Sequence, residues 1–362
     1  MKHITLIAAV RPNFMKIAPI IHAIHEVQKQ GVDLKYRLVH TGQHYDKKMS
    51  GSFFEQLQIP EPHVNLESGG GTQAEQTANV MVRFEQELLA NPTDLVLVVG
   101  DVNSTMACSI TAKKLNITVA HVEAGIRSGD LSMPEEINRL LTDAITDLFF
   151  TTSELANSNL RNSGVSEDKI FFVGNTMIDT LLKQRSNFKA PAIWDNLKLT
   201  KNNYIVLTLH RPANVDEASQ LKGMLDEIVA NTKELPLVFP VHPRTAKILK
   251  ELNVSHQRLH MIEPLGYLEF NYLVEKAKAV ITDSGGITEE ASVMNVPCLT
   301  LRDNTERPET ITLGTNELVG TNPANIKPFL DRLFSGNWKK GNDIPMWDGK
   351  TAQRIITSLT EL

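Results

Sequence analysis

Asp283-Ser-Gly-Gly-Ile-Thr-Glu-Glu290 joins an apolar run, residues 277–282, to a segment of helical character, residues 287–294. The apolar run predicts a buried strand, so the order is strand, two glycines, helix start. That order presents free backbone N–H groups to a phosphate and makes Ser284, Gly285 and Gly286 candidate diphosphate ligands. Glu290 lies about one helical turn after Gly286, where its carboxylate is placed to accept hydrogen bonds from two ribose hydroxyls. A glycine turn followed by solvated glutamates is the structural alternative.

The same alternation of short apolar runs and helical periodicity extends along nearly the whole chain. Predicted strands in the first half span residues 4–10, 35–40, 95–99, 118–122, 148–152 and 170–173. Those in the second half span residues 204–209, 237–241, 260–262, 279–282 and 298–301. Helical segments such as 16–30, 76–89 and 104–115 lie between the strands. This pattern is typical of a parallel, doubly wound sheet.

The sequence predicts an α/β fold with two Rossmann-like, doubly wound domains that face each other across a cleft. An aperiodic and then polar stretch, residues 185–203, separates the two sets of strands and indicates a linker. We expect one domain over residues 1–180, joined by an amphipathic C-terminal helix at 349–362, and a second domain over 181–348. Functional loops in such sheets lie at the carboxyl ends of the strands, and the unusual residues fall there.

The composition excludes several classes of protein. The 362 residues are 41% hydrophobic and 22% charged, as in a soluble globular protein, and the net charge of -5 argues against nucleic acid as a partner. No apolar run approaches the ~18 residues that a membrane span needs. The chain enters a strand directly, without signal-peptide features, and we expect a cytoplasmic protein. Cys108 and Cys298 are expected to be buried thiols, and neither has metal-ligand spacing, so we expect no metal site.

Cationic side chains gather at the predicted strand ends. Arg11 and Lys16 stand at the first strand–helix junction, Arg211 follows the first strand of the second half, and Arg307 lies in a Thr-Glu-Arg-Pro segment. A diphosphate leaving group needs positive charge, and arginine suits this bidentate task. Any one of these residues alone is explained as well by a surface charge. Their shared placement at strand ends favours ligand binding.

Carboxylates are predicted at the same strand ends. Asp101 follows the apolar run 95–99 and one glycine, and Glu123 follows the run 118–122. Both sit at the mouth of a buried sheet, where a carboxylate is a candidate for general acid–base work. Glu135 and Glu136 stand at a helix start, where acidic residues also simply favour the helix dipole.

Three of the eleven histidines, His44, His210 and His242, end predicted strands or follow them. His210 is the strongest candidate among them, for phosphate contact or proton transfer. His121 lies within a strand and is expected to be a hydrogen-bonded core residue. The segment after the first strand reads Ala8-Ala-Val-Arg-Pro-Asn13 rather than Gly-x-Gly-x-x-Gly, and no Walker loop is present. We therefore expect neither bound NAD nor a P-loop ATPase.

Taken together, these segments resemble the non-hydrolysing UDP-N-acetylglucosamine 2-epimerase family from residue 5 to about residue 320. The matching motifs are Arg11-Pro-x-x-x-Lys16, Thr41-Gly-Gln-His44, Gly100-Asp101, His121-Val-Glu-Ala-Gly125, Pro134-Glu-Glu-x-Asn-Arg139, His210-Arg211, Pro240-Val-His-Pro243, Asp283-Ser-Gly-Gly-Ile-x-Glu-Glu290 and Arg302-Asp-x-Thr-Glu-Arg-Pro-Glu309. The resemblance implies a GT-B-like fold and reversible inversion at C2 of UDP-N-acetylglucosamine, which gives UDP-N-acetylmannosamine. It places the family's acid–base residues on Asp101, Glu123, Glu135 and His210. It places the substrate contacts on Arg11, Lys16, Gln43, His44, His242, Ser284, Gly285, Gly286, Glu290 and Arg307.

The implied chemistry fits these residue types. The C2 proton of the sugar is not acidic, because no carbonyl group is adjacent to it. Oxidation at C3 would require NAD, whose fingerprint the sequence lacks. The other route expels UDP, leaves a 2-acetamidoglucal, and returns UDP after C2 is protonated on the opposite face. That route needs cations on the diphosphate, carboxylates near C2 and exclusion of water, but no cofactor.

The chain departs from the family pattern at several places. Asn13 stands where the family has an acidic residue, Leu131-Ser-Met-Pro134 replaces a longer aromatic stretch, and Leu209-His-Arg-Pro-Ala-Asn214 replaces Gly-His-Arg-Arg-Glu-Asn. Some family members bind a second UDP-N-acetylglucosamine as an activator. Asp46 replaces a glutamine of that site, and residues 69–71 lack an expected arginine. We therefore predict that activation is absent or weak here.

Other interpretations remain open. The altered loops at Asn13 and Ser132-Met133 are compatible with another UDP-sugar, such as a 2,3-diacetamido uronic acid derivative. A hydrolysing epimerase would release free N-acetylmannosamine, but its family opens differently. A GT-B glycosyltransferase would need an acceptor site, and a nucleotide-sugar sensor would bind without turnover. The resemblance also implies a homodimer and a role in cell-wall or capsule polysaccharide synthesis.

Overall fold

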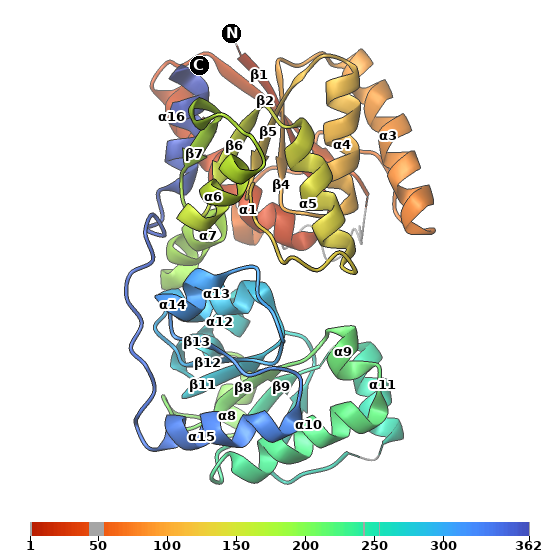
Figure 1. The fold of residues 1–362 in the computed structure, drawn as a ribbon. Helices are drawn as coiled ribbons and strands as arrows, with labels where there is room; N and C mark the ends of the chain where they lie inside the picture. Colours follow the sequence, from red (N-terminus) through yellow and green to blue (C-terminus); the bar gives the residue numbers. More distant parts are fainter. Residues whose placement is uncertain (1, 43–53, 242, 253, 362) are drawn as a thin grey trace. The chain divides into compact units, whose positions relative to one another are not determined.

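The computed structural model describes residues 2–42, 54–241, 243–252 and 254–361 (Figure 1). The chain forms two compact units, of which unit 1 comprises Met1–Thr180 and Pro345–Leu362, and unit 2 comprises Leu181–Ile344. In both units, parallel strands alternate with helices. The predicted α/β fold with two Rossmann-like domains is therefore confirmed.

The described part of unit 1 contains a sheet of seven parallel strands in the order β3-β2-β1-β4-β5-β6-β7. The strands are β1 (Lys2–Ala8), β2 (Leu34–His40), β3 (Val64–Asn65), β4 (Leu95–Val99), β5 (Thr118–Val122), β6 (Leu148–Thr151) and β7 (Ile170–Phe172). Every residue of β4 is buried, as expected for a strand that is covered on both faces. The winding direction reverses between β1 and β4, which pair directly. The loops after these two strands therefore adjoin at the carboxyl edge of the sheet, where α/β proteins bind ligands.

The helices of unit 1 cover this sheet. They are α1 (Arg11–Lys29), α3 (Gln73–Ala90), α4 (Asn103–Lys114), α5 (Pro134–Ile145), α6 (Glu154–Asn162), α16 (Thr351–Glu361) and the first half of α7 (Thr176–Gln184). Figure 1 shows α3, α4 and α5 side by side, with α4 in the middle. The helix α1 begins at Arg11 rather than at the predicted residue 16. Pro12 is compatible with this early start, because the first turn of a helix does not need its missing N–H group.

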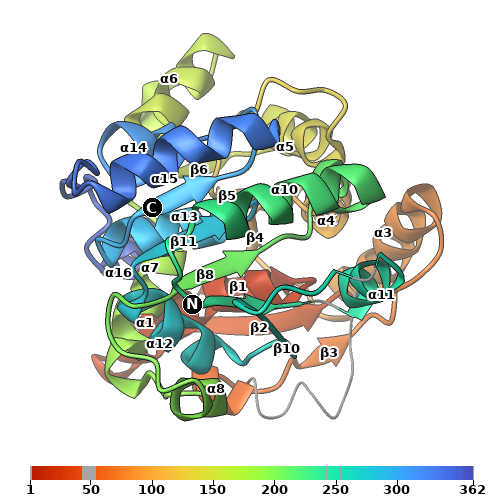
Figure 2. The same ribbon diagram turned by 90° about the horizontal axis from the view of Figure 1, so that it is seen from below.

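The described part of unit 2 contains six parallel strands in the order β10-β9-β8-β11-β12-β13. They are β8 (Ile205–Thr208), β9 (Leu237–Pro240), β10 (Leu259–Ile262), β11 (Ala279–Thr282), β12 (Cys298–Thr300) and β13 (Asn316–Leu318). The helices are α8 (Ala192–Asn196), α9 (Pro212–Val215), α10 (Ala218–Asn231), α11 (Pro243–Glu251), α12 (Tyr267–Lys276), α13 (Gly285–Val293), α14 (Pro308–Thr312) and α15 (Ile326–Phe334). Figure 2 shows α10 and α15 next to each other, and their apolar faces join the core formed by β8, β9 and β11.

The chain returns to unit 1 at its C-terminal end. Trp347 is buried there, and its Nε1 donates to the backbone oxygen of Thr152 over 3.0 Å. Asp179 of α7 accepts the backbone N–H groups of Thr351 and Ala352, and so caps the first turn of α16. α16 then packs against α1. The C-terminal segment therefore supports the helix that begins at the carboxyl edge of the sheet.

Both cysteines are buried thiols, as predicted. Burial raises the pKa of Cys298 to about 12 and also raises the pKa of Cys108. Neither thiol is therefore a reactive nucleophile at neutral pH. Among the described helices, none combines the length and the apolar character that crossing a membrane requires.

Candidate active site

A buried ion pair joins α1 to the loop after β5. Lys16 Nζ lies 2.7 Å from Glu123 Oε2, and the two side chains are only 15% and 5% exposed. Glu123 has a φ of +74°, a left-handed conformation that costs a non-glycine residue energy and persists only where the surroundings impose it. A carboxylate held in this way, beside a cation at the carboxyl edge, is suited to proton transfer.

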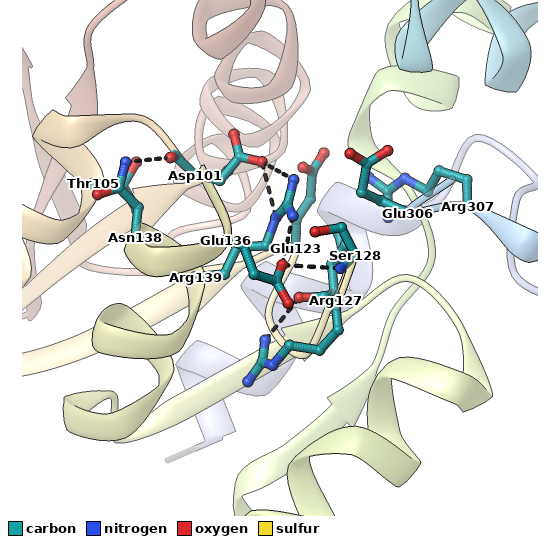
Figure 3. A network of polar contacts seen from close by, with 12 residues as sticks. Asp101, Thr105, Glu123, Arg127, Ser128, Glu136, Asn138, Arg139, Glu306 and Arg307 are labelled. Carbon is teal, nitrogen blue, oxygen red and sulfur yellow. Dashed lines mark hydrogen bonds and ion pairs between the residues drawn. The ribbon is translucent and has the colours of Figure 1, made fainter. Parts of the chain in front are cut away.

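Asp101 lies on the neighbouring loop, directly after β4. Its Oδ2 accepts from Arg139 Nε over 3.0 Å and from Arg139 Nη2 over 2.6 Å (Figure 3). Gly100 precedes it with a φ of +70°, and a Cβ added there would lie 3.2 Å from Lys16 Nζ and 3.9 Å from Glu123 Oε2. The structure therefore brings the predicted residues Asp101, Glu123 and Lys16 to one edge of the unit 1 sheet.

The two glutamates at the start of α5 have different environments. Glu136 is buried, and its carboxylate accepts from the backbone N–H groups of Ser128 and Gly129 and from Arg139 Nη1. Burial raises the pKa of Glu136, but these hydrogen bonds lower it by more, so the pKa lies below its usual range. Glu136 therefore anchors the loop before α5 (Figure 3). Glu135 is half-buried.

Sequence reasoning assigned no role to Arg139, although this buried residue connects two carboxylates. One edge of its guanidinium group binds Asp101, and Nη1 lies 2.8 Å from Glu136 Oε2. The spacing of Glu136 and Arg139, three positions apart on a helix, was a visible signal for an ion pair. The second partner, 38 residues earlier in the chain, leaves no such local signal.

Arg11 and Asn13 lie in the first turn of α1. Arg11 is the first residue of the helix and is exposed at the carboxyl edge. Asn13 is buried, and its Oδ1 accepts the backbone N–H groups of Ala9 and Val10 over 3.1 Å, while Nδ2 donates to Val99 O. A carboxylate has no N–H group to donate to Val99. The asparagine at this position therefore links the turn after β1 to the end of β4.

In unit 2, the buried Asp283 organises the loop after β8. Its carboxylate accepts the backbone N–H groups of His210 and Arg211 and the side-chain Nδ2 of Asn214. His210 Nδ1 also lies 2.7 Å from Asp283 Oδ1, although the histidine side chain is 52% exposed. Burial raises the pKa of Asp283, but His210 and the other donors lower it by more, so the pKa lies below its usual range. With Nδ1 occupied by Asp283, Nε2 is the ring nitrogen of His210 that a ligand can reach.

The helix α13 presents its N-terminus at the carboxyl edge of unit 2. Gly285 and Gly286 form its first turn, so the helix begins two residues earlier than predicted, with Ser284 before it. The first N–H groups of a helix have no intrahelical acceptor, and the helix dipole favours an anion at this end. A Cβ added at Gly286 would meet none of the described atoms within 4 Å, which leaves open space for phosphate groups.

Two adjacent glutamates of α13 are both buried but have different partners. Glu290 Oε1 accepts from the hydroxyl group of Tyr267 over 2.8 Å, and burial raises the pKa of Glu290 to about 7. Glu289 pairs with Nε of Arg307. Arg307, a predicted substrate contact, therefore has part of its guanidinium group committed to α13.

Three predicted substrate contacts, Gln43, His44 and His242, lie outside the described residues, as does Asp46 of the predicted activator site. Within the described ranges, no three or more His, Cys, Asp or Glu side chains are grouped so that they could hold a metal ion.

The fold and its sites define a class, that of proteins with two Rossmann-like α/β units. The family model for UDP-N-acetylglucosamine 2-epimerase matches residues 25–360. A UDP-N-acetylglucosamine 2-epimerase from Methanocaldococcus jannaschii is 42% identical over 99% of this chain and 98% of its own length. The crystal structure of the Methanocaldococcus jannaschii UDP-GlcNAc 2-epimerase in complex with UDP-GlcNAc and UDP has a TM-score of 0.87 and 40% identity, and the match covers 99% of this chain and 100% of that chain.

A second relative carries a different substrate in its name. A UDP-2,3-diacetamido-2,3-dideoxy-D-glucuronate 2-epimerase from Pseudomonas aeruginosa is 41% identical over 88% of this chain and 88% of its own length. Both relatives and the family model agree on the type of enzyme. The chain belongs to the UDP-N-acetylglucosamine 2-epimerase family.

Proposed function

We propose that this protein catalyses the reversible epimerisation of UDP-N-acetylglucosamine to UDP-N-acetylmannosamine at C2, without a cofactor. The observation that carries the proposal is the pair of carboxylates, Asp101 and Glu123, at the ends of neighbouring strands, each bound to a cation. Inversion at C2 requires that a proton be removed from one face of the sugar and another delivered to the opposite face. Family membership supports the same reaction.

Unit 2 supplies groups suited to the UDP leaving group. The N–H groups at the start of α13, around Ser284, Gly285 and Gly286, suit the diphosphate. His210, whose Nδ1 is held by Asp283, presents Nε2 to the ligand. Donors such as the N–H groups of α13 stabilise the charge that develops on the diphosphate as its bond to C1 breaks. Glu290 is the acceptor for the ribose hydroxyls.

Unit 1 supplies the proton-transfer groups. One of the carboxylates Asp101 and Glu123 takes the C2 proton, and the C2–H electron pair forms the C1–C2 double bond of a 2-acetamidoglucal. The diphosphate oxygen leaves with the electron pair of its bond to C1. The other group of the pair, in its carboxylic acid form, then gives its proton to C2 on the opposite face, and a diphosphate oxygen of UDP bonds again to C1. Lys16 and Arg11 contribute positive charge, and Glu135 is a third proton-transfer candidate.

A second substrate, a UDP-2,3-diacetamido-2,3-dideoxy-glucuronate, is favoured by a specific observation. The Pseudomonas aeruginosa relative named for that substrate is 41% identical over 88% of this chain, against 42% over 99% for the relative named for UDP-N-acetylglucosamine. The two substrates undergo the same inversion at C2 and differ at C3 and C6. The carboxylates and the diphosphate site serve both reactions, so they do not discriminate between them.

Proton NMR of the purified protein with each nucleotide sugar in D₂O tests the proposal. We expect UDP-N-acetylmannosamine to appear from UDP-N-acetylglucosamine with deuterium at C2, without added NAD or metal. Turnover of the diacetamido uronate alone would assign the second substrate. Free N-acetylmannosamine and UDP would instead indicate a hydrolysing enzyme. Binding of both sugars without any turnover would contradict an epimerase and indicate a sensor.

The proposal includes a homodimer in the cytoplasm that supplies sugar nucleotides for cell-wall or capsule polysaccharide. The two buried, unpaired thiols are compatible with a reducing compartment. The helix α5 supports the dimer, because its polar side faces the protein. Its buried residues are Glu136, Asn138, Arg139, Thr142 and Asp143. Its exposed residues include Ile137, Leu140 and Leu141, at 46%, 39% and 46% exposure. An apolar helix face of this kind is typical of an association surface.

A further inference from the structure

The second half of α5 directs a buried carboxylate, that of Asp143, toward the end of β5. Asp143 Oδ1 lies 2.8 Å from Nδ1 of His121 in that strand. Asp143 Oδ2 accepts from the backbone N–H group of Gly125 over 3.0 Å and from Arg127 Nη1 over 2.6 Å. This single side chain therefore connects α5 to β5 and to the loop that follows it.

His121, predicted to be a hydrogen-bonded core residue, is fully buried, and both of its ring nitrogens face oxygen atoms. Nε2 lies 2.8 Å from the backbone oxygen of Gly100, which can only accept a hydrogen bond. Burial raises the pKa of Asp143, but the hydrogen bonds and charges of His121 and Arg127 lower it by more, so this carboxyl group is ionised and also only accepts. Two acceptors require two donors. The positions of these two oxygen atoms therefore call for a hydrogen-bond donor at each ring nitrogen of His121.

The Gly100 peptide that His121 binds adjoins both proposed proton-transfer groups. Gly100 donates its N–H to Val122 O over 3.1 Å and accepts from His121, so this left-handed residue is fixed through both of its backbone polar groups. Asp101 is the next residue in the chain. A Cβ added to Gly100 would lie 3.9 Å from Glu123 Oε2. A movement of this peptide would therefore change the separation of Asp101 and Glu123.

We propose that His121 and Asp143 form a positioning pair, in which the buried imidazolium ion holds the Gly100 carbonyl group and thereby sets the distance between Asp101 and Glu123. The inference rests on the proposed function, because inversion at C2 requires two carboxylates placed on opposite faces of one carbon atom. Neither member of the pair touches the substrate. By setting the distance between Asp101 and Glu123, the pair determines how often the intermediate is protonated on one face of C2 relative to the other face.

The charge state of His121 is tested without any turnover. The full-length protein is labelled with ¹⁵N-histidine, and the signals of His121 are assigned by their loss in His121→Gln. We expect both ring nitrogens of His121 to be protonated at pH 7.5, with two slowly exchanging N–H protons, because the ring is buried. A neutral ring, with one nitrogen lacking a proton, would overturn the proposal.

Two substitutions separate the two contacts of the ring. The glutamine introduced by His121→Gln carries its amide N–H near the position of Nε2 and can still donate to Gly100 O, whereas the shorter side chain of His121→Asn reaches only toward Asp143. We expect His121→Asn to lower kcat by about 10- to 100-fold, because small misplacements of reacting groups have effects of this size. We expect KM to change less than about threefold. In D₂O, two rates are compared: deuterium entry into the recovered starting material and formation of the epimer. The ratio of the first rate to the second should be higher in His121→Asn than in the wild type. His121→Gln should bring this exchange-to-epimerisation ratio most of the way back to the wild-type value.

Asp147→Asn is the matched control, because Asp147 holds the opposite end of the same strand through Val119 N and Lys113. We expect this control to lower the thermal midpoint without changing the exchange-to-epimerisation ratio. If His121→Asn and His121→Gln lose kcat equally and keep the wild-type ratio, the pair is only structural and the proposal is overturned. A wild-type protein that turns over neither nucleotide sugar would instead overturn the proposed function. The NMR experiment would still decide the protonation of His121, because it does not depend on turnover.

Discussion

Burial raises the pKa of Glu290 to about 7, so this carboxyl group of α13 titrates near neutral pH. In the unfolded chain it titrates near ~4.3. Between these two values the folded state holds a proton that the unfolded chain has released, and the free energy of unfolding therefore falls as pH rises across that window. Above pH 7 the folded protein contains a buried carboxylate whose charge is an unfavourable contribution.

The first prediction is that Glu290→Gln stabilises the ligand-free protein at high pH. The difference in the free energy of unfolding between the variant and the wild type should shift in favour of the variant by on the order of 3 kcal/mol from pH 4.5 to pH 8. This figure is an upper estimate from the shift in pKa. Thermal unfolding of unit 2 at both pH values measures the change. Glu263→Gln, at an exposed position of the same unit, is the control and should behave like the wild type at both values. An equal gain at pH 4.5 and pH 8 would contradict the assignment.

The second prediction at this scale concerns Glu123. Glu123→Gln keeps the size of the side chain and the ability to accept from Lys16 but removes the group that transfers a proton. We expect kcat to fall by about 10²- to 10⁴-fold, the range found for general acid–base groups. UDP affinity, measured by calorimetry, should stay within about threefold, because the proposed UDP ligands of unit 2 are unchanged and the glutamine can still accept from Lys16. A variant with wild-type deuterium exchange at C2 would show that Glu123 is not the base.

At the scale of the element, α5 is an amphipathic helix whose polar side is buried and whose apolar side includes exposed residues. The buried side is stable because its charges are paired, Arg139 with Asp101 and Glu136, and Asp143 with Arg127. The proposed homodimer would cover the exposed apolar side. The helix would then serve two purposes, one for each face.

The third prediction tests the exposed face of α5. Leu140→Glu should convert the proposed dimer to a monomer at micromolar concentration, since a charge within an apolar interface loses its hydration without gaining a partner. Leu155→Glu, at an apolar position on α6 that is 50% exposed against 39% for Leu140, is the control and should remain dimeric. Multi-angle light scattering measures the mass. A Leu140→Glu protein that stays dimeric would place the interface elsewhere.

At the scale of the whole molecule, unit 1 is built from two separate stretches of the chain. The last 18 residues, from Pro345 to the end, return to it after the chain has formed unit 2. Their attachment depends on the buried Trp347 and on the cap that Asp179 provides for α16. The stability of the unit that carries Asp101 and Glu123 therefore depends on the far end of the sequence.

The fourth prediction is that Trp347→Ala destabilises unit 1 selectively. Loss of a buried tryptophan costs about 3–5 kcal/mol. Trp338→Ala, which removes a tryptophan with a similar N–H to carbonyl bond in unit 2, is the matched control. Hydrogen exchange followed by mass spectrometry should show reduced protection in residues 2–180 for Trp347→Ala and in 181–344 for Trp338→Ala. Equal loss of protection in both units for each variant would mean that they unfold as one.

Much of this protein can be predicted from local patterns. Apolar runs such as 95–99 and 118–122 identified the central strands of unit 1, because a strand covered on both faces is apolar at every position. Two edge elements were missed. β3 has only two residues, and β13 reads Asn-Glu-Leu, so neither shows a period that sequence analysis can detect. Both lie at the edges of their sheets, where burial imposes fewer constraints.

By itself, the sequence determined the two α/β units and the strand ends at which polar residues gather, because backbone periodicity and burial act over a few residues. Only the tertiary structure decided which of these residues are partners. The pairs Arg139 with Asp101 and His210 with Asp283 join positions 38 and 73 apart. They form because parallel strands bring the loops that follow them, and the helices after those loops, to one edge of the sheet. The buried polar face of α5 was decided in the same way. An amphipathic pattern defines two faces of a helix but does not say which face is buried. In α5 the polar face is buried because Arg139 and Asp143 pair with Asp101, His121 and Arg127 at the edge of the sheet.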